Sequence, residues 1–187
     1  VVEGFTRILK EDYGRQIEMG ATMAAEEINA AGGVLGCKVE IRFMDDENRP
    51  ATGVKNTRLL VTDWGAHFTV GTDSSGVAMA MGPVLAELKR IHFFTHAATH
   101  RLTEELVAGK GIKEIVRVSV PVYQDGIIAA LIFKDRMDIK RWATIGADYE
   151  YGYTSWNLFK ETLKQYRPDV EFVAAAWAPF LTLDFSP

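Results

Sequence analysis

The chain has 187 residues and a formal net charge of -4, with 48% hydrophobic and 25% charged residues. This length is enough for one well-packed domain, or for one domain and part of a second. Lys and Arg are scattered along the chain, so no basic footprint for DNA, RNA or an anionic membrane is present in the sequence. The chain also contains no apolar stretch long enough to cross a bilayer, and its single cysteine excludes an internal disulfide.

The first part of the chain alternates helical and strand patterns. Over residues 14–33, apolar and small residues recur at helical spacing, and a glycine pair predicts the end of that helix. Residues 38–44 alternate apolar and polar side chains, which predicts a half-buried strand near a sheet edge. Pro50 opens a second helical stretch, and a turn at 63–65 leads into a strand over 66–70.

The same alternation continues to the end of the chain. Apolar spacing predicts a helix over 77–88, which Pro83 should kink or delay. Four further strands are predicted over 91–95, 114–120, 142–146 and 170–177, with helices near 124–137 and 154–166. In the last helix we expect a buried stripe of Trp156, Phe159, Leu163 and Tyr166.

Repeated alternation of helix and strand predicts an α/β fold, in which a mostly parallel Rossmann-like sheet carries helices on both faces. Ligands of such sheets bind beyond the carboxyl ends of the strands. The loops that follow strands are therefore where function is expected.

The first of these loops, residues 72–76, joins a strand to a helix. Free backbone N–H groups and the helix dipole favour an anion at such a helix start, and Ser75 can add a hydroxyl donor. Ser74 is a second candidate ligand-binding residue. The competing interpretation is that Ser74 or Ser75 only caps the helix.

The second loop, residues 96–99, follows the strand that ends at Thr95. The Ala97 carbonyl and the Thr99 hydroxyl can accept hydrogen bonds from an ammonium, while N–H groups of the loop can help to hold a carboxylate. His96 and His100 flank the loop without a third metal ligand at useful spacing. We therefore interpret them as surface or loop-packing residues and predict no metal site.

The third loop, residues 148–152, contains tyrosines. An aromatic ring there can form a wall against an apolar ligand body while its hydroxyl finds a polar partner. The competing interpretation is that these are turn and helix-entry residues.

Enzyme motifs are incomplete, so we predict a protein that is not an enzyme and has no cofactor. The GGVLG run at 32–36 follows a helix and precedes a strand, the reverse order of a dinucleotide-binding loop. Asp45 and Asp46 follow a predicted strand as in some magnesium sites, but further carboxylates at strand ends are not evident. TDSSG lacks the nucleophile-elbow pattern. Nothing near Cys37 would activate its thiol, so we expect a small buried residue.

Several blocks of sequence resemble one family, in the same order along the chain. Residues 13–54, from YGRQIEMGATMAAEEINAAGG to RPATGV, are similar to the opening signature of type I periplasmic substrate-binding proteins of ABC transporters, in the branched-chain amino acid (leucine, isoleucine and valine) group. VGTDSSGVAMA, FFTHAAT, VRVSVPVYQDG, IGADYEYG and the terminal DFSP resemble later blocks of the same family. The resemblance covers nearly the whole chain and is specific in combination.

The resemblance implies two Rossmann-like lobes, joined by crossover strands, that close around a ligand in the cleft between them. The first crossover would fall near residues 119–122. Residues 1–120 would then form the N-terminal ligand-binding lobe, and residues 121–187 would begin a second lobe that is incomplete in this chain.

The resemblance also implies roles for individual residues. Ser75 would hold the ligand carboxylate through its hydroxyl and N–H, and Thr99 would add further hydrogen bonds. Ala97 would offer its carbonyl to the ligand ammonium. Tyr151 would close over the ligand from the second lobe, and Tyr13 would line the pocket for the ligand side chain.

The chain departs from the family pattern in places. Residues 1–12 replace an expected apolar strand and Gly-Pro-rich loop, which affects where Tyr13 lies. His96 stands where the family commonly has proline, and Val122 and Tyr123 where it often has polar residues, so Tyr123 would make the pocket more aromatic. The acidic residue that usually pairs with the ligand ammonium would come from a part of the second lobe absent from this chain.

The function implied is that of the extracytoplasmic solute-binding component of an ABC importer. Such a protein would capture a branched-chain amino acid or a related small carboxylate in the periplasm or outside the cell, where a lipid anchor can retain it. Its partners would be that ligand and a membrane permease, with no nucleic acid and no direct insertion into the membrane. The alternative is a ligand-sensing domain of a regulator or receptor on the same fold.

Overall fold

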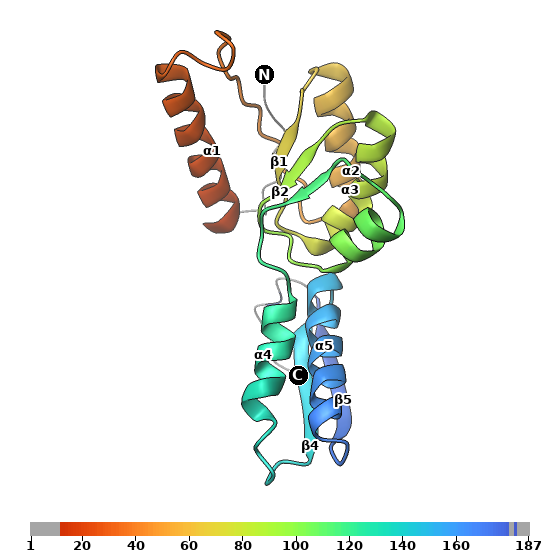
Figure 1. Cartoon of the computed structure of the whole chain (residues 1–187). Coiled ribbons are helices and arrows are strands. Elements are labelled where there is room, and N and C mark those ends of the chain that lie inside the picture. Colours follow the sequence, from red (N-terminus) through yellow and green to blue (C-terminus); the bar gives the residue numbers. More distant parts are fainter. Residues whose placement is uncertain (1–11, 180–181, 183–187) are drawn as a thin grey trace. The chain divides into compact units, whose positions relative to one another are not determined.

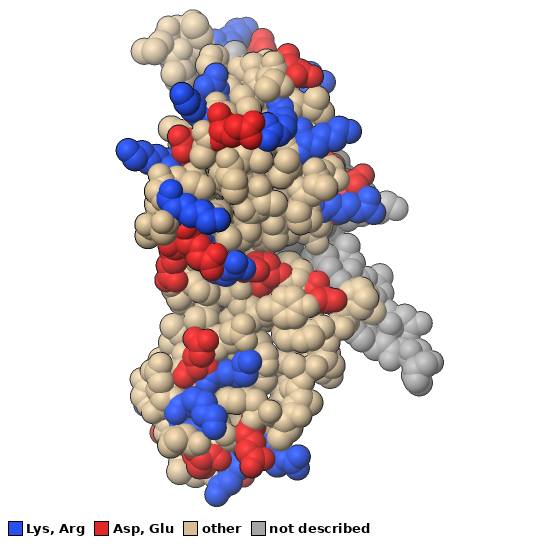
Figure 2. All heavy atoms as spheres, turned by 90° about the vertical axis from the view of Figure 1, so that its right-hand side faces the viewer, with Lys and Arg blue, Asp and Glu red and all other residues tan. Residues whose placement is uncertain are grey.

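The computed structural model describes residues 12–179 and residue 182. The chain divides into two compact units, one ending at Ser119 and the other beginning at Val120. Each unit contains a parallel sheet with helices packed against it, as predicted. Among the described helices, none is long and apolar enough to span a bilayer. Acidic and basic side chains are interspersed on the face shown in Figure 2.

The first unit is built around the three-stranded parallel sheet β1-β2-β3. Residue Thr69 of β1 pairs with His92 of β2, which pairs with Ile115 of β3. Helices α2 and α3 lie on one side of this sheet and α1 on the other (Figure 1). The described elements are α1 (Asp12–Ala30), α2 (Pro50–Arg58), the π-helical turn η1 (Leu59–Asp63), β1 (Thr69–Gly71), α3 (Ser75–Leu88), β2 (His92–Phe94), the π-helical segment η2 (Leu102–Gly109) and β3 (Ile115–Arg117).

The core of the first unit lies between α3, β2 and η2. Met81, Leu85, Phe94 and Leu106 are almost completely buried there. A Cβ atom at Gly82 would collide with the Leu106 side chain, so this glycine allows α3 and η2 to approach closely. The helix α3 begins at Ser75 and continues through Pro83, so the proline does not delay it.

The second unit contains a two-stranded parallel sheet and two helices, α4 (Tyr123–Phe133), β4 (Arg141–Ala147), α5 (Glu150–Tyr166) and β5 (Glu171–Ala178). Its buried cluster joins Ala130 of α4 to Phe159 and Leu163 of α5. The burial of Phe159 and Leu163 confirms the centre of the apolar stripe predicted for α5. Tyr166, the last residue of the helix, is instead 52% exposed, and its ring lies beside the Lys134 ammonium group.

The predicted strand over residues 38–44 is wrong. Its side chains alternate as expected, with Val39 and Ile41 less exposed than their neighbours, but the segment pairs with no described strand. The backbone of Val39 bonds instead to the Asn29 side chain of α1, through contacts of 2.7 and 2.9 Å. The pattern therefore predicted the two faces correctly, but a strand also needs a neighbour for its backbone groups.

Two further differences concern single features. Cys37 is exposed, contrary to the prediction, because it lies in a short turn where its backbone pairs with that of Val34 in an isolated bridge. The segment η2 was not predicted, because its two fully buried residues, Leu102 and Leu106, are separated by acidic residues.

Candidate functional site

The loop after β1 turns sharply before α3 begins. Thr72 has a positive φ of 65°, which is rare for a β-branched residue and reverses the chain there. The hydroxyl of Ser74 accepts from the backbone N–H of Val77 at 3.5 Å and caps α3. Ser74 thus has the capping role of the competing interpretation, while Ser75 is the first residue of the helix.

The loop after β2 is tied to the loop after β1 at two points. The N–H of Ala97 donates to the Thr72 carbonyl at 3.1 Å, and the N–H of Thr99 donates to the Ser75 hydroxyl oxygen at 3.2 Å. Because Ser75 Oγ accepts in this contact, its own proton remains available to donate to another group. Three predicted ligand residues, Ser75, Ala97 and Thr99, are therefore together at the carboxyl edge of the sheet; their roles in binding stay predictions.

Arg117, the last residue of β3, and Ser119, two residues later, both bond to the same loop. Arg117 donates from Nη1 to the Thr99 carbonyl at 2.7 Å and to the Ala98 carbonyl at 3.4 Å. Ser119 Oγ donates to the Ala97 carbonyl at 2.8 Å, which leaves that carbonyl its second lone pair. Burial lowers the pKa of Arg117, and the nearby Glu104 carboxylate opposes this shift. Sequence reasoning missed Arg117 and Ser119, because both lie inside the strand predicted over residues 114–120 and not in a loop after a strand.

A buried histidine supports the turn at Thr72. His92 Nδ1 lies 2.7 Å from Thr69 Oγ1, and His92 Nε2 lies 3.1 Å from Thr72 Oγ1. Burial lowers the pKa of His92 to about 3, and a backbone hydrogen bond with Gly71 opposes this shift only in part. The imidazole is therefore neutral at physiological pH and can donate to one threonine while accepting from the other.

The two histidines that flank the second loop lie beside carboxylates. His96 Nε2 is 3.1 Å from Asp73 Oδ1, and His100 Nε2 is 3.8 Å from Glu104. No group of three or more potential metal ligands is found within the part of the chain that the structure describes. The acidic pair after residues 38–44 stabilises the turn in which it lies. Asp45 Oδ1 accepts a hydrogen bond from the Glu47 N–H, and Asp46 Oδ1 accepts one from the Asn48 N–H.

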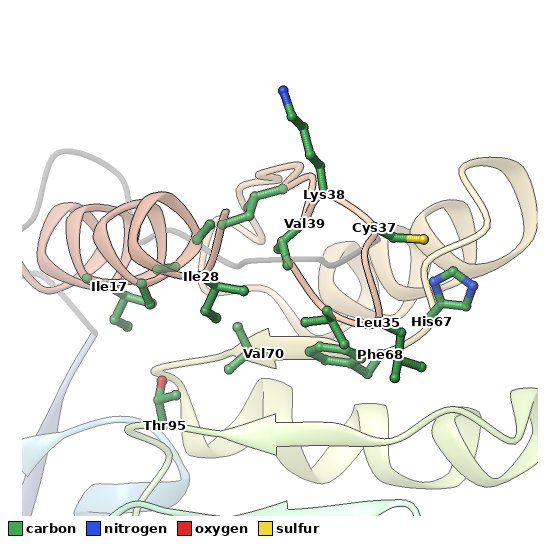
Figure 3. A pocket seen from close by; sticks show the side chains of 16 residues that line it. Ile17, Ile28, Leu35, Cys37, Lys38, Val39, His67, Phe68, Val70 and Thr95 are labelled. Carbon is green, nitrogen blue, oxygen red and sulfur yellow. The ribbon is translucent and has the colours of Figure 1, made fainter. Parts of the chain in front are cut away.

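A large apolar cavity in the first unit lies on the α1 side of the sheet. It has a volume of about 750 Å³ and separates α1 from β1, with Ile28, Leu35, Val39 and Val70 among its walls (Figure 3). Thr95 reaches it at one end. Its lining is almost entirely aliphatic and aromatic, so it lacks the few convergent polar groups that orient a small ligand.

The second unit has its own hollow along β4, beside α4 and α5. A cavity of about 520 Å³ there is lined by Tyr149, Tyr151, Trp177 and Asp125, among others. The Tyr151 hydroxyl donates to Asp125 Oδ2 at 2.7 Å. Tyr151 is thus at a hollow with its hydroxyl bonded to a polar partner, the arrangement expected for the third loop.

Tyr123 and Tyr13 are the two remaining residues predicted to bind the ligand. Tyr123 is the first residue of α4 and is half-buried. The side chain of Tyr13 lies outside the described residues, although α1 begins at Asp12.

Comparison with known proteins places this arrangement in a family. The family described as periplasmic binding protein matches residues 9–187. The Leu/Ile/Val-binding protein BraC3 of Rhizobium johnstonii is 34% identical over 151 residues, which are 81% of this chain and 40% of that protein. A Leu/Ile/Val-binding protein homolog 3 of Brucella melitensis is 32% identical over 82% of this chain and 40% of its own length.

Solved structures agree on the fold. An ABC transporter solute-binding protein of R. palustris, in complex with 4-hydroxybenzoate, superposes with a TM-score of 0.76 at 26% identity, over 97% of this chain and 48% of that one. The branched-chain amino acid binding protein LivJ of Streptococcus pneumoniae, in complex with isoleucine, gives a TM-score of 0.79 at 24% identity, over 97% and 50%. This chain therefore spans half or less of the length of these relatives. By the family match over most of its length, the chain belongs to the periplasmic binding proteins.

Proposed function

We propose that this chain is part of the extracytoplasmic solute-binding component of an ABC importer, which binds a small carboxylate and performs no bond chemistry. The observation that carries the proposal is the contact of Ser75 Oγ with the Thr99 N–H at the start of α3. This contact holds a hydroxyl donor at a helix N-terminus, where partial positive charge favours an anion.

The ligand class follows from the family and from the loops. We propose a branched-chain amino acid or a related carboxylate on an apolar or aromatic body, with the carboxylate bonded by Ser75 and Thr99. Ala97 would accept from an ammonium through its remaining lone pair, and Tyr151 would cover the apolar body. Tyr13, Tyr123 and Ser74 remain candidates for the pocket wall.

We propose further that residues 1–120 form most of the first lobe and that residues 121–187 begin the second. The relatives support import over ligand sensing, because they are named as transporter binding proteins. The partner would be a membrane permease. The location would be the periplasm, or the cell exterior with a lipid anchor, and fractionation of cells that express the gene would test it.

Calorimetry tests the binding proposal directly. The protein as its gene encodes it is titrated with leucine, isoleucine, benzoate and 4-hydroxybenzoate, and then with the methyl ester of any ligand that binds. We expect binding to be lost with the ester, because the ester removes the anionic charge while keeping the body of the ligand. Equal affinity for acid and ester would refute the carboxylate site.

A further inference from the structure

The hollow of the second unit runs along β4 and reaches the first turns of two helices. Asp125 is in the first turn of α4, and Tyr151 is in the first turn of α5. Both line the cavity of about 520 Å³, together with the rings of Tyr149 and Trp177. That volume is within the range of about 300–1,000 Å³ that is typical of small-molecule sites.

Glycines bring these helix starts together. A Cβ atom on Gly126 would lie 2.6 Å from Leu158 Cβ and 2.8 Å from the Ser155 carbonyl, so only glycine lets α4 pack this closely on α5. A Cβ atom on Gly152 would collide with the Ala147 carbonyl at the end of β4. Asp125 and Tyr151 each neighbour one of these glycines, and the packing places their polar ends in contact.

The hydrogen bond between Tyr151 and Asp125 determines which of the two residues donates and which accepts. The Tyr151 hydroxyl donates a hydrogen bond to Asp125 Oδ2 at 2.7 Å, so the phenol hydroxyl is directed at the carboxylate. A carboxylate accepts at both of its oxygens, and Asp125 takes part in no ion pair among the residues described. The Asp125 carboxylate therefore offers an acceptor oxygen at the cavity, beside aromatic rings.

We infer that Asp125 is a specificity-determining residue, which orients Tyr151 and forms with it a subsite for a hydrogen-bond-donating group on the ligand body. This inference rests on the proposed function. The donating group can be an ammonium, which Asp125 would then share with the Ala97 carbonyl, or a hydroxyl, as in a hydroxylated aromatic acid. A ligand without such a group would leave the carboxylate facing an apolar surface, which is unfavourable.

Matched pairs of ligands separate the two sources of the donor. Leucine is compared with 4-methylpentanoate, which lacks only the ammonium, and 4-hydroxybenzoate is compared with benzoate, which lacks only the hydroxyl. Calorimetry on the protein as its gene encodes it should show at least a tenfold preference for the donor-bearing member of one pair. The pair that shows the preference identifies the donor.

The variant Asp125→Asn keeps the shape of the side chain but replaces one acceptor oxygen by an NH₂ donor. We expect the preference to fall at least tenfold while the affinity for the donor-free member changes less than threefold. Tyr151→Phe should weaken both members, because the ring loses its anchor, and should keep part of the preference through the Asp125 carboxylate.

The matched control is Asp148→Asn. Asp148 accepts a hydrogen bond from the Tyr153 hydroxyl in the same unit, but neither residue lines the cavity. We expect the Asp148→Asn variant to prefer the donor-bearing ligand as strongly as the unmodified protein does. Binding with a preference that Asp125→Asn leaves unchanged, or binding without preference in either pair, would overturn this inference alone. Failure of the unmodified protein to bind any of the four carboxylates would overturn the proposed function, and this inference with it.

Discussion

The hydroxyl oxygen of Ser75 accepts a hydrogen bond from the Thr99 N–H across two neighbouring loops, while Ser74 beside it caps α3. The two adjacent serines therefore have separable roles. One joins the loops that we propose to hold the ligand carboxylate, and the other satisfies a backbone donor of the helix.

We predict that Ser75→Ala weakens carboxylate binding by about 1–3 kcal/mol, the range for loss of a charge-assisted hydrogen bond. Ser74→Ala should instead lower the free energy of unfolding by about 0.5–2 kcal/mol, as expected for a lost N-cap, with a smaller effect on affinity. Calorimetry and thermal unfolding of both variants check this. If only Ser74→Ala lost affinity for the carboxylate, Ser74 and not Ser75 would be the ligand-binding serine.

The carboxyl ends of parallel strands meet at one edge of a sheet, and this rule predicted which loops come together. It placed Ser75 and Thr99 near each other although they are 24 residues apart, and the structure confirms that contact. The rule does not say which buried side chains support the loops. Arg117 and His92 bond to residues 14 to 23 positions away, and no local pattern distinguishes such a polar residue from any other in a strand.

The spacing of apolar residues predicted a helix or strand reliably where one face of that element is buried, and less reliably elsewhere. It predicted the apolar centre of α5 from Phe159 and Leu163, whose positions pack against α4. It failed at residues 38–44, where alternation describes side chains but not the partner that backbone groups require. The Asp125–Tyr151 contact was also not predictable from the sequence, because it depends on how closely Gly126 lets α4 and α5 approach each other.

Arg117 gives a second prediction. Its planar guanidinium bonds two carbonyls of the 97–99 loop and the Thr103 hydroxyl, a geometry that a lysine ammonium cannot reproduce. We expect Arg117→Lys to weaken ligand binding by about 1–3 kcal/mol, because the loop loses its fixed position. Amide hydrogen exchange at Thr99 should become faster in the variant. Unchanged exchange together with unchanged affinity would show that Arg117 does not position this loop.

Gly126 gives a third prediction. Alanine at this position would force its Cβ to within 3.0 Å of Leu158 Cβ, the Ser155 carbonyl and the Phe159 nitrogen, so α4 and α5 must separate. We expect Gly126→Ala to lower the free energy of unfolding by about 1–3 kcal/mol. The control is Gly20→Ala in the interior of α1, where no atom lies within 4 Å of the added carbon. That variant should be stabilised by about 0.5–1 kcal/mol, and equal effects of the two would contradict the packing argument.

His92 gives the last prediction, which concerns pH. Burial depresses the pKa of His92 in the folded protein from about 6.5 to about 3, so the folded state stays neutral over a range where the unfolded chain takes up a proton. The stability associated with the neutral imidazole is therefore fully present above pH 6.5. It is lost progressively as the pH falls towards 3, with a slope of at most about 1.4 kcal/mol per pH unit from this one group.

Thermal unfolding between pH 8 and pH 4 tests this expectation in the unmodified protein and in His92→Asn. The variant should be less stable at pH 8, because Thr69 and Thr72 lose well-placed hydrogen-bond partners. Its stability should nevertheless fall less steeply below pH 6.5, since asparagine does not titrate in this range and the remaining slope comes from the other titrating groups. The difference between the two slopes isolates the contribution of His92. Parallel curves throughout would mean that this imidazole titrates in the folded protein much as it does in the unfolded chain, and that the Thr69–His92–Thr72 chain is not sealed from water.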